Sequence, residues 1–224
     1  MKNCSLPTRK ECFDILAQYN VPPHIINHCR VAAKLAAFLA QKLTEKGFEV
    51  DVELIDRACL LHDIMRMCDT KESDLNSFVQ GLSEEDKIKW QRLVAKYKGT
   101  PHEYAAFDIL KQKYPALALT VRRHRYMGLL SEDDKPETWE EKIVYYADKR
   151  VMHETIVSLQ ERLDEGHKRN YHQHGSKAQC RKNTTKVDSL IFQMEKEISK
   201  TVGFDIAEIT EEYIDSNSKQ DTGE

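Results

Sequence analysis

Four histidines and two aspartates lie in stretches of the sequence that we expect to be buried: His28, His62, Asp63, His102, His124 and Asp148. A buried imidazole or carboxylate needs a partner, because taking an unpaired polar or charged group out of water is costly. One such histidine alone is more often an ordinary hydrogen-bonded core residue. Six together favour a divalent cation, since imidazole nitrogen and carboxylate oxygen can bind one jointly. The set therefore predicts a metal centre.

Burial of these residues is inferred from the apolar pattern around each of them. The segment ACLLHDIMRMC is apolar at eight of its eleven positions, so His62 and Asp63 are expected inside the protein. The other four residues fall on apolar faces with helical spacing. These faces lie in NHCRVAAKLAAFL for His28, PHEYAAFDIL for His102, LALTVRRH for His124 and IVYYADKRVM for Asp148.

The segments that carry these residues read as helices, and alternating strand patterns are nearly absent. Capping boxes are expected at Thr8 with Glu11, Thr100 with Glu103 and Thr138 with Glu141. We expect an all-α fold, with helices at 8–19, 23–45, 52–68, 83–98, 101–113, 116–126, 138–165, 186–202 and 205–216. Residues 1–165 form the expected helical metal-binding domain. Residues 166–224 form a basic loop and C-terminal helices that pack on this core.

Composition narrows the class of protein. A chain of 224 residues suits one domain with an appendage, and its net charge of −3 gives no general attraction to nucleic acid or anionic membrane. No apolar run reaches membrane-spanning length, and the first residues lack the apolar segment of a secretory signal, so we expect a cytoplasmic protein. Its oligomeric state is open, and a homodimer is compatible with the sequence. The cysteines form no Cys-x-x-Cys pair and are expected to be reduced: Cys4, Cys12, Cys29, Cys59, Cys68 and Cys180.

An early histidine, an apolar His-Asp doublet, two further histidines and a late aspartate on a helical chain resemble the HD superfamily of metal-dependent phosphohydrolases. The doublet is His62-Asp63. The presence of both His102 and His124 resembles the binuclear branch, which includes bacterial HD-type hydrolases of diadenosine tetraphosphate. The resemblance implies one metal held by His28, His62, Asp63 and Asp148. It also implies a second metal, held by His102 and His124 and bridged by Asp63.

The resemblance further implies hydrolysis of a nucleotide phosphoester or phosphoanhydride by a metal-bridging hydroxide, with Asp63 and Arg66 as catalytic residues. The histidine-rich ligand set favours iron, manganese, cobalt, nickel or zinc over magnesium. Arg66 follows the doublet where many relatives have a lysine, and its planar guanidinium suits phosphate oxygens. The candidate phosphate ligands are Arg66, Arg123, Arg125 and Lys149, and Arg122 and Arg150 also lie beside expected ligands.

Two other functions use the same residues. A di-iron oxygenase of the HD fold carries the same ligand pattern, and a noncatalytic HD module would sense a nucleotide or a partner. The basic loop at 167–186 carries His167, His172 and His174. These histidines would suit a second metal site or RNA contacts, although a solvated loop is the favoured interpretation. His24 and His153 lie near expected ligands in the sequence but do not fit the motif.

Overall fold

The computed structural model describes residues 6–69, 78–170 and 177–218, and it is helical apart from one two-stranded hairpin. This confirms the all-α expectation. The α-helices are α1 (Arg9–Gln18), α2 (Pro23–Glu45), α3 (Val52–Leu61), α5 (Glu84–Lys96), α6 (His102–Leu110), α7 (Pro115–Arg122), α8 (Trp139–Asp148), α9 (Leu159–Asn170), α10 (Lys177–Val202) and α11 (Glu211–Ser218). Short 3₁₀ helices are η1 (Arg66–Asp69), η3 (Tyr126–Leu130) and η4 (Ile206–Glu208).

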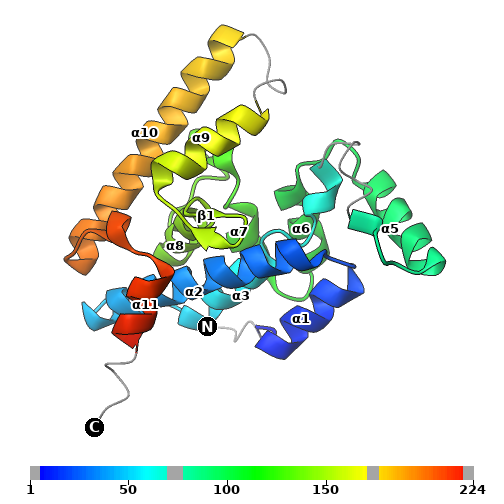
Figure 1. Cartoon of the computed structure of the whole chain (residues 1–224), viewed down its shortest axis with the longest axis horizontal. Coiled ribbons are helices and arrows are strands. Elements are labelled where there is room, and N and C mark those ends of the chain that lie inside the picture. Colours follow the sequence, from blue (N-terminus) through cyan, green and yellow to red (C-terminus); the bar gives the residue numbers. More distant parts are fainter. Residues whose placement is uncertain (1–5, 70–77, 171–176, 219–224) are drawn as a thin grey trace.

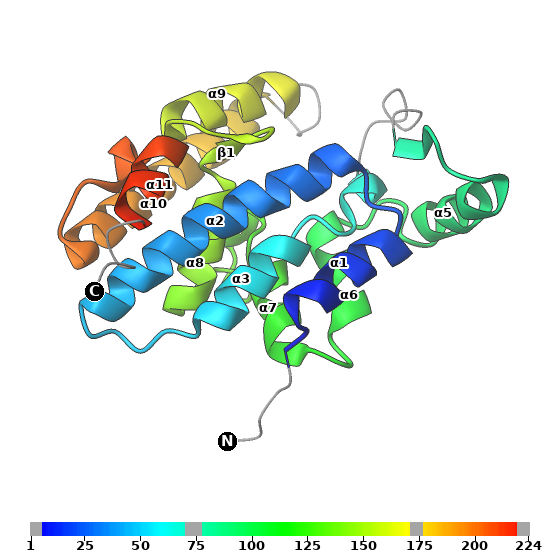
Figure 2. The same ribbon diagram turned by 60° about the horizontal axis from the view of Figure 1, so that its bottom comes forward.

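Helix α2 runs through the middle of the molecule and packs against α3 and α8 (Figures 1 and 2). It starts at Pro23, whose fixed φ suits the first helical position and whose missing N–H is not needed there. Its buried face is rich in alanine and leucine, which lets the neighbouring helices approach closely. Helix α5 lies at one end of the molecule, and α10 lies at the other end (Figure 1).

Two of the three expected capping boxes are present. Thr8 and Thr138 accept hydrogen bonds from the backbone of Glu11 and Glu141, and each glutamate accepts one in return. The third box is wrong, because α6 begins at His102 with Pro101 as its N-cap and has no side-chain cap of its own. Glu103 points inward instead and is only 6% exposed.

The helix expected at 138–165 is interrupted after Asp148. The chain forms an antiparallel hairpin of β1 (Val151–Met152) and β2 (Thr155–Ile156), and α9 then follows. The turn residue His153 has a φ of +55°, a left-handed conformation that histidine tolerates better than most residues. Glu154 accepts a hydrogen bond of 3.1 Å from the Asn27 amide on α2, so the hairpin turn is held against the residue before His28.

The helix expected at 52–68 ends at Leu61. After it the backbone tightens to bonds three residues apart, from Ile64 N–H to the Leu61 carbonyl and from Arg66 N–H to the Asp63 carbonyl. The apolar composition of this segment predicts a longer buried helix. A buried turn requires the same composition, because it too is covered by protein on several sides.

Residues expected to form the basic loop are largely helical where the structure describes them. Helix α9 reaches Asn170 and α10 starts at Lys177, while His172 and His174 lie outside the described residues. Helix α9 crosses the expected boundary between 165 and 166, so the two-part division stays a prediction. Helix α10 packs on α2, α8 and η3. The expected loop was inferred from polarity alone, and polar residues also cover surface helices.

Arg150 joins the C-terminal segment to the rest of the chain. Its guanidinium is 1% exposed and donates to the carbonyls of Ile206, Ala207 and Ile209 at 2.7, 3.1 and 3.0 Å. The same group donates to the Tyr146 hydroxyl at 2.6 Å. Through these hydrogen bonds, Arg150 anchors η4 and the residues that follow it.

Within the described ranges, no helix has the length and apolarity needed to cross a membrane. Four of the six cysteines, Cys12, Cys29, Cys59 and Cys68, are buried free thiols. Cys4 and the side chain of Cys180 lie outside what the structure describes.

Candidate metal centre

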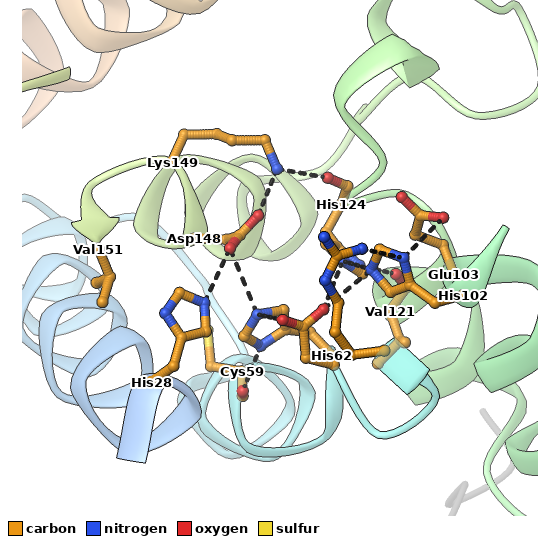
Figure 3. Close-up of polar contacts among 12 residues, drawn as sticks. His28, Cys59, His62, His102, Glu103, Val121, His124, Asp148, Lys149 and Val151 are labelled. Atoms are coloured by element: carbon orange, nitrogen blue, oxygen red, sulfur yellow. Dashed lines mark hydrogen bonds and ion pairs between the residues drawn. The ribbon is translucent and has the colours of Figure 1, made fainter. Parts of the chain in front are cut away.

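The structure brings all six sequence-predicted ligand residues into one buried cluster (Figure 3). His28 comes from α2, His62 and Asp63 from the turn after α3, and Asp148 from the end of α8. His102 begins α6, and His124 lies just beyond α7. None of the six is more than 9% exposed. We call this group the His/Asp cluster.

One half of the His/Asp cluster is built around Asp148. Its Oδ1 lies 3.1 Å from His28 Nε2 and 3.4 Å from His62 Nε2. Among the described residues, His62 Nε2 is a buried nitrogen without an assigned hydrogen-bond partner, although Asp148 Oδ1 lies 3.4 Å away. An orphaned buried nitrogen beside a carboxylate oxygen is what a missing cation between them would leave.

The other half is built around Asp63. Its Oδ1 lies 2.9 Å from His102 Nε2 and 3.9 Å from His124 Nε2, and the two Nε2 atoms are 3.2 Å apart. Asp63 Oδ2 lies 3.7 Å from His62 Nε2. The two oxygens of Asp63 therefore face ligand atoms in different halves of the cluster.

The Nδ1 atoms of the histidines all have acceptors on the outside of the cluster. His28 Nδ1 lies 3.0 Å from the His153 carbonyl, and His62 Nδ1 lies 2.7 Å from the Cys59 carbonyl. His124 Nδ1 contacts the carbonyl of Val121. Since a carbonyl only accepts, each of these Nδ1 atoms carries a proton, and each Nε2 is directed toward the cluster. Outer acceptors orient metal-binding histidines in the same way.

His102 is oriented by a carboxylate that sequence reasoning missed. Asp69 Oδ2 accepts a hydrogen bond of 2.7 Å from His102 Nδ1 and one of 3.3 Å from the His102 backbone. Asp69 thus replaces the expected Thr100 cap and also fixes the imidazole. Arg66 donates to the other oxygen of Asp69 at 2.7 Å and lies 3.2 Å from His102 Nδ1. Asp69 is three residues after Arg66, and this spacing was the only signal in the sequence.

The electrostatic environment of the His/Asp cluster shifts the pKa values of its members. Burial alone would raise the pKa of Asp63 and Asp148, but nearby imidazoles and cationic side chains hold both pKa values well below their usual range. Burial opposes the charged form of His102, yet Glu103 and Asp69 raise its pKa to about 10. His124 differs, because burial and the charges of His62 and His102 hold its pKa well below the ordinary value.

The donor atoms and charges of this environment also suit a divalent cation. Asp63, Asp69, Glu103 and Asp148 are four carboxylates in or beside the His/Asp cluster, and the nearby cationic side chains include Arg66, Lys149 and Arg169. Three triads of cluster residues bring ligand atoms within 4.8 Å of one another: His28, His62 and Asp63; His62, His124 and Asp148; and Asp63, His102 and His124. The clustered residues could therefore bind metal ions through nitrogen and oxygen together.

The other basic residues considered as phosphate ligands have different partners in the structure. Arg123 donates to Glu141 at 2.8 Å and Glu137 at 3.1 Å, which joins the turn after α7 to the start of α8. Arg122 pairs with Asp134 at 2.7 Å, and Arg125 lies over the Tyr104 ring at 5.7 Å. Lys149 contacts the His/Asp cluster directly, through Asp148 and the backbone of His124.

The other described histidines, which are not members of the His/Asp cluster, make separate contacts. His153 supplies a backbone carbonyl to His28, although its side chain was not expected to take part. His24 is exposed and packs edge-on against Phe78 at 5.5 Å. His167 Nε2 lies 2.8 Å from Asp188 Oδ2 and connects α9 to α10.

Known proteins resemble this chain over most of its length. A tRNA (cytidine(56)-2'-O)-methyltransferase of Picrophilus torridus is 25% identical over 92% of this chain and 51% of its own length. The protein of the same name from Thermoplasma volcanium is 25% identical over 91% of this chain and 50% of its own length. The chain thus spans about half the length of these two relatives. An uncharacterized protein of Methanocaldococcus jannaschii is 28% identical over 64% of this chain and 80% of its own length.

No solved structure gives a significant match. The HD domain family matches residues 25–152, which is more than half of the chain and includes all six residues of the His/Asp cluster. With that match and the buried cluster of histidines and aspartates together, the chain belongs to the HD domain family.

Proposed function

We propose that this HD-domain protein is a metal-dependent phosphohydrolase that acts on a small nucleotide phosphoester or phosphoanhydride. The observation that supports it is the common orientation of the imidazoles, whose Nδ1 atoms are bonded outward while their Nε2 atoms face the oxygens of Asp63 and Asp148. Two transition-metal ions, chosen from iron, manganese, cobalt, nickel and zinc, suit this donor set.

Asp63 is the residue proposed to join the two metal positions. Its Oδ1 faces His102 and its Oδ2 faces His62, so a single carboxylate reaches both halves of the cluster. His28, His62 and Asp148 would complete the first position, and His102 and His124 would complete the second. Bound divalent cations would supply Lewis acidity, which would lower the pKa of a coordinated water and neutralise the negative charge that develops on the phosphate.

Arg66 is proposed to bind the substrate phosphate. Its side chain is 28% exposed, lies beside His102 and is held by Asp69. The planar guanidinium group suits phosphate oxygens, and its charge compensates the negative charge that builds up during phosphoryl transfer. Arg66 stays charged throughout the pH range of catalysis, so it orients the substrate and does not transfer a proton.

Two alternative activities use the same residues. A di-iron oxygenase would consume oxygen when the protein is loaded with ferrous iron, and it would release no phosphate. A nucleotide-sensing module would bind nucleotide without turnover. The proximity of Arg66 to His102 favours a phosphorylated substrate.

The test is a substrate panel on metal-loaded protein. Purified protein is assayed for metal content and then for phosphate or nucleotide release from dinucleoside polyphosphates, nucleoside monophosphates and cyclic nucleotides. We expect turnover of one class, and loss of both metal and turnover in His62→Ala and Asp63→Ala. The matched control is His24→Ala, an exposed histidine on α2. Oxygen consumption without phosphate release would refute the hydrolase, and full activity in both cluster variants would refute the assignment of catalysis to the His/Asp cluster.

Contact with RNA is a second candidate function, favoured by the exposed basic residues Arg181, Lys182 and Lys186 on α10. Two relatives are named as tRNA methyltransferases, and the match to each includes nearly all of this chain. A basic helix face that contacts phosphates would give affinity that falls steeply with salt. Gel-shift titration with unfractionated tRNA tests this, with the triple glutamate variant of these residues as the control for charge. Equal affinity of the variant would contradict it.

A further inference from the structure

Lys149 is a buried cation in direct contact with the His/Asp cluster. Its side chain is 9% exposed, and it follows Asp148 at the C-terminal end of α8. The Nζ atom contacts Asp148 Oδ2 and donates a hydrogen bond of 3.0 Å to the carbonyl of His124 (Figure 3). It also lies 4.9 Å from the centre of the Tyr145 ring.

These three contacts occupy the bonding capacity of the ammonium group. A lysine ammonium has three N–H donors. Two of its neighbours are hydrogen-bond acceptors, a carboxylate and a carbonyl, and the third is the face of an aromatic ring, which attracts cations. A substrate phosphate would have to displace one of these buried contacts. The surroundings of Lys149 therefore differ from those of Arg66, whose side chain is 28% exposed.

The two carboxylate oxygens of Asp148 have different partners. Oδ2 faces Lys149, whereas Oδ1 faces His28 Nε2 and His62 Nε2 at 3.1 and 3.4 Å. Lys149 thus leaves one oxygen directed to the cluster and favours a carboxylate that binds a cation through that oxygen alone.

The contact with His124 extends the effect to the other half of the cluster. His124 lies in the turn after α7, and its ring contacts the Val121 carbonyl through Nδ1 while Nε2 faces His102. The backbone carbonyl held by Lys149 belongs to the same residue as this imidazole. One ammonium group therefore spans from the end of α8 to the turn after α7.

We propose that Lys149 is a positioning residue, which fixes Asp148 and the His124 turn relative to each other and thereby sets the affinity of the cluster for metal, without contacting substrate. The proposal rests on the proposed function, because it assigns the His/Asp cluster to metal binding. It replaces the role of phosphate ligand that the sequence suggested for this lysine.

The test compares Lys149→Met with Lys142→Met by titration with Co²⁺. Lys142 lies on the same helix and forms one ion pair, with Glu197 at 2.6 Å, so the control also replaces a paired lysine by methionine. We expect Lys149→Met to weaken Co²⁺ binding by roughly 10-fold to 100-fold, the range found when outer partners of metal ligands are removed. We also expect a changed visible absorption spectrum, because the geometry at the cation changes. Lys142→Met should bind Co²⁺ as the wild type does.

Kinetics at saturating metal separates positioning from substrate contact. A positioning role predicts a lower kcat with KM within about 2-fold of wild type, since uniform substrate binding is unaffected. A raised KM with unchanged Co²⁺ affinity and spectrum would overturn the proposal and restore the phosphate contact. If Lys149→Met does not fold by circular dichroism, Lys149→Arg keeps the charge and carries the same test, with a shifted Co²⁺ spectrum expected and a wild-type spectrum overturning the proposal.

The two proposals fail in distinguishable ways. Wild-type protein that binds no Co²⁺ would overturn both. Wild-type protein that binds Co²⁺ but hydrolyses no phosphorylated compound would overturn only the hydrolase, and the Co²⁺ titrations of the variants would still decide the role of Lys149.

Discussion

His102 Nε2 and His124 Nε2 face each other at 3.2 Å inside the protein, while the Nδ1 atom of each ring contacts an acceptor outside the cluster. Two neutral rings held in this way would bring two lone pairs together. A proton or a cation between them removes the repulsion. Because Asp63 Oδ1 lies 2.9 Å from His102 Nε2, a cation there would also satisfy the carboxylate. Because the pKa of His102 is raised to about 10, His102 supplies this proton in the metal-free protein, and a bound cation would have to displace it.

Replacing Asp69 should weaken metal binding although Asp69 lies outside the His/Asp cluster. Asp69 accepts from His102 Nδ1 at 2.7 Å, and removal of such an outer partner costs about 10-fold to 100-fold in metal affinity. Competition with a chelating dye measures the change in Asp69→Ala. Asp108→Ala is the matched control, because Asp108 also forms hydrogen bonds at α6 but contacts Tyr97 and Lys111. Equal affinities in the two variants would show that Asp69 does not orient His102.

Metal affinity should increase as the pH rises from 6 to 9. In the metal-free protein the pKa of His102 is raised to about 10, so His102 binds a proton over this range. Metal must displace that proton, and binding of metal therefore releases protons and becomes tighter at higher pH. The raised pKa also stabilises the metal-free fold below the unfolded value of about 6.5, and this contribution is lost as the pH approaches 10.

Titration calorimetry in two buffers of different ionisation enthalpy measures the number of protons released. His102→Gln removes the titrating group and should flatten the dependence on pH. An unchanged slope in that variant would assign the released protons to other residues.

Replacing Arg66 should impair catalysis more than metal binding. A hydrogen bond to a charged group contributes about 1.5–3 kcal/mol, so Arg66→Ala should lower kcat/KM roughly 10-fold to 100-fold. The matched control is Arg92→Ala, which removes an exposed arginine from α5. If Arg66→Ala instead loses metal to the same degree as Asp69→Ala and keeps its KM, then Arg66 acts only through its contact with Asp69.

The sequence predicted the all-α fold, the bounds of α2 and the burial of the six cluster residues, because these depend on apolar composition and periodicity. Each of the six expected residues lies on a face or in a segment that is buried in the structure. The helix α2 has the expected bounds, since Pro23 marks its start and an uninterrupted apolar stripe continues to its end. Local patterns of this kind are read directly from neighbouring residues.

The outer partners of the cluster could not be predicted in this way. Asp69 meets His102 across 33 positions, and His153 meets His28 across 125 positions through a backbone carbonyl, which carries no residue-specific signal. Glu103 followed the capping-box pattern but turned inward, because Asp69 satisfies the start of α6 instead. The hairpin after Asp148 was missed because its strands are only two residues long.

Arg150→Met should destabilise the fold without removing metal ligands. The variant leaves the carbonyls of Ile206, Ala207 and Ile209 without the donor that they share, in a place where water has little access. Removing one partner of a buried charged network costs about 3–5 kcal/mol, so the urea midpoint should fall strongly. Arg181→Met is the control, because this exposed residue of α10 should change stability by less than about 0.5 kcal/mol. Equal urea midpoints for the two variants would mean that the hydrogen bonds from Arg150 to the segment that begins at Ile206 do not stabilise the fold. Co²⁺ binding by folded Arg150→Met should match the wild type, since the guanidinium contacts η4 and the residues after it, not the His/Asp cluster.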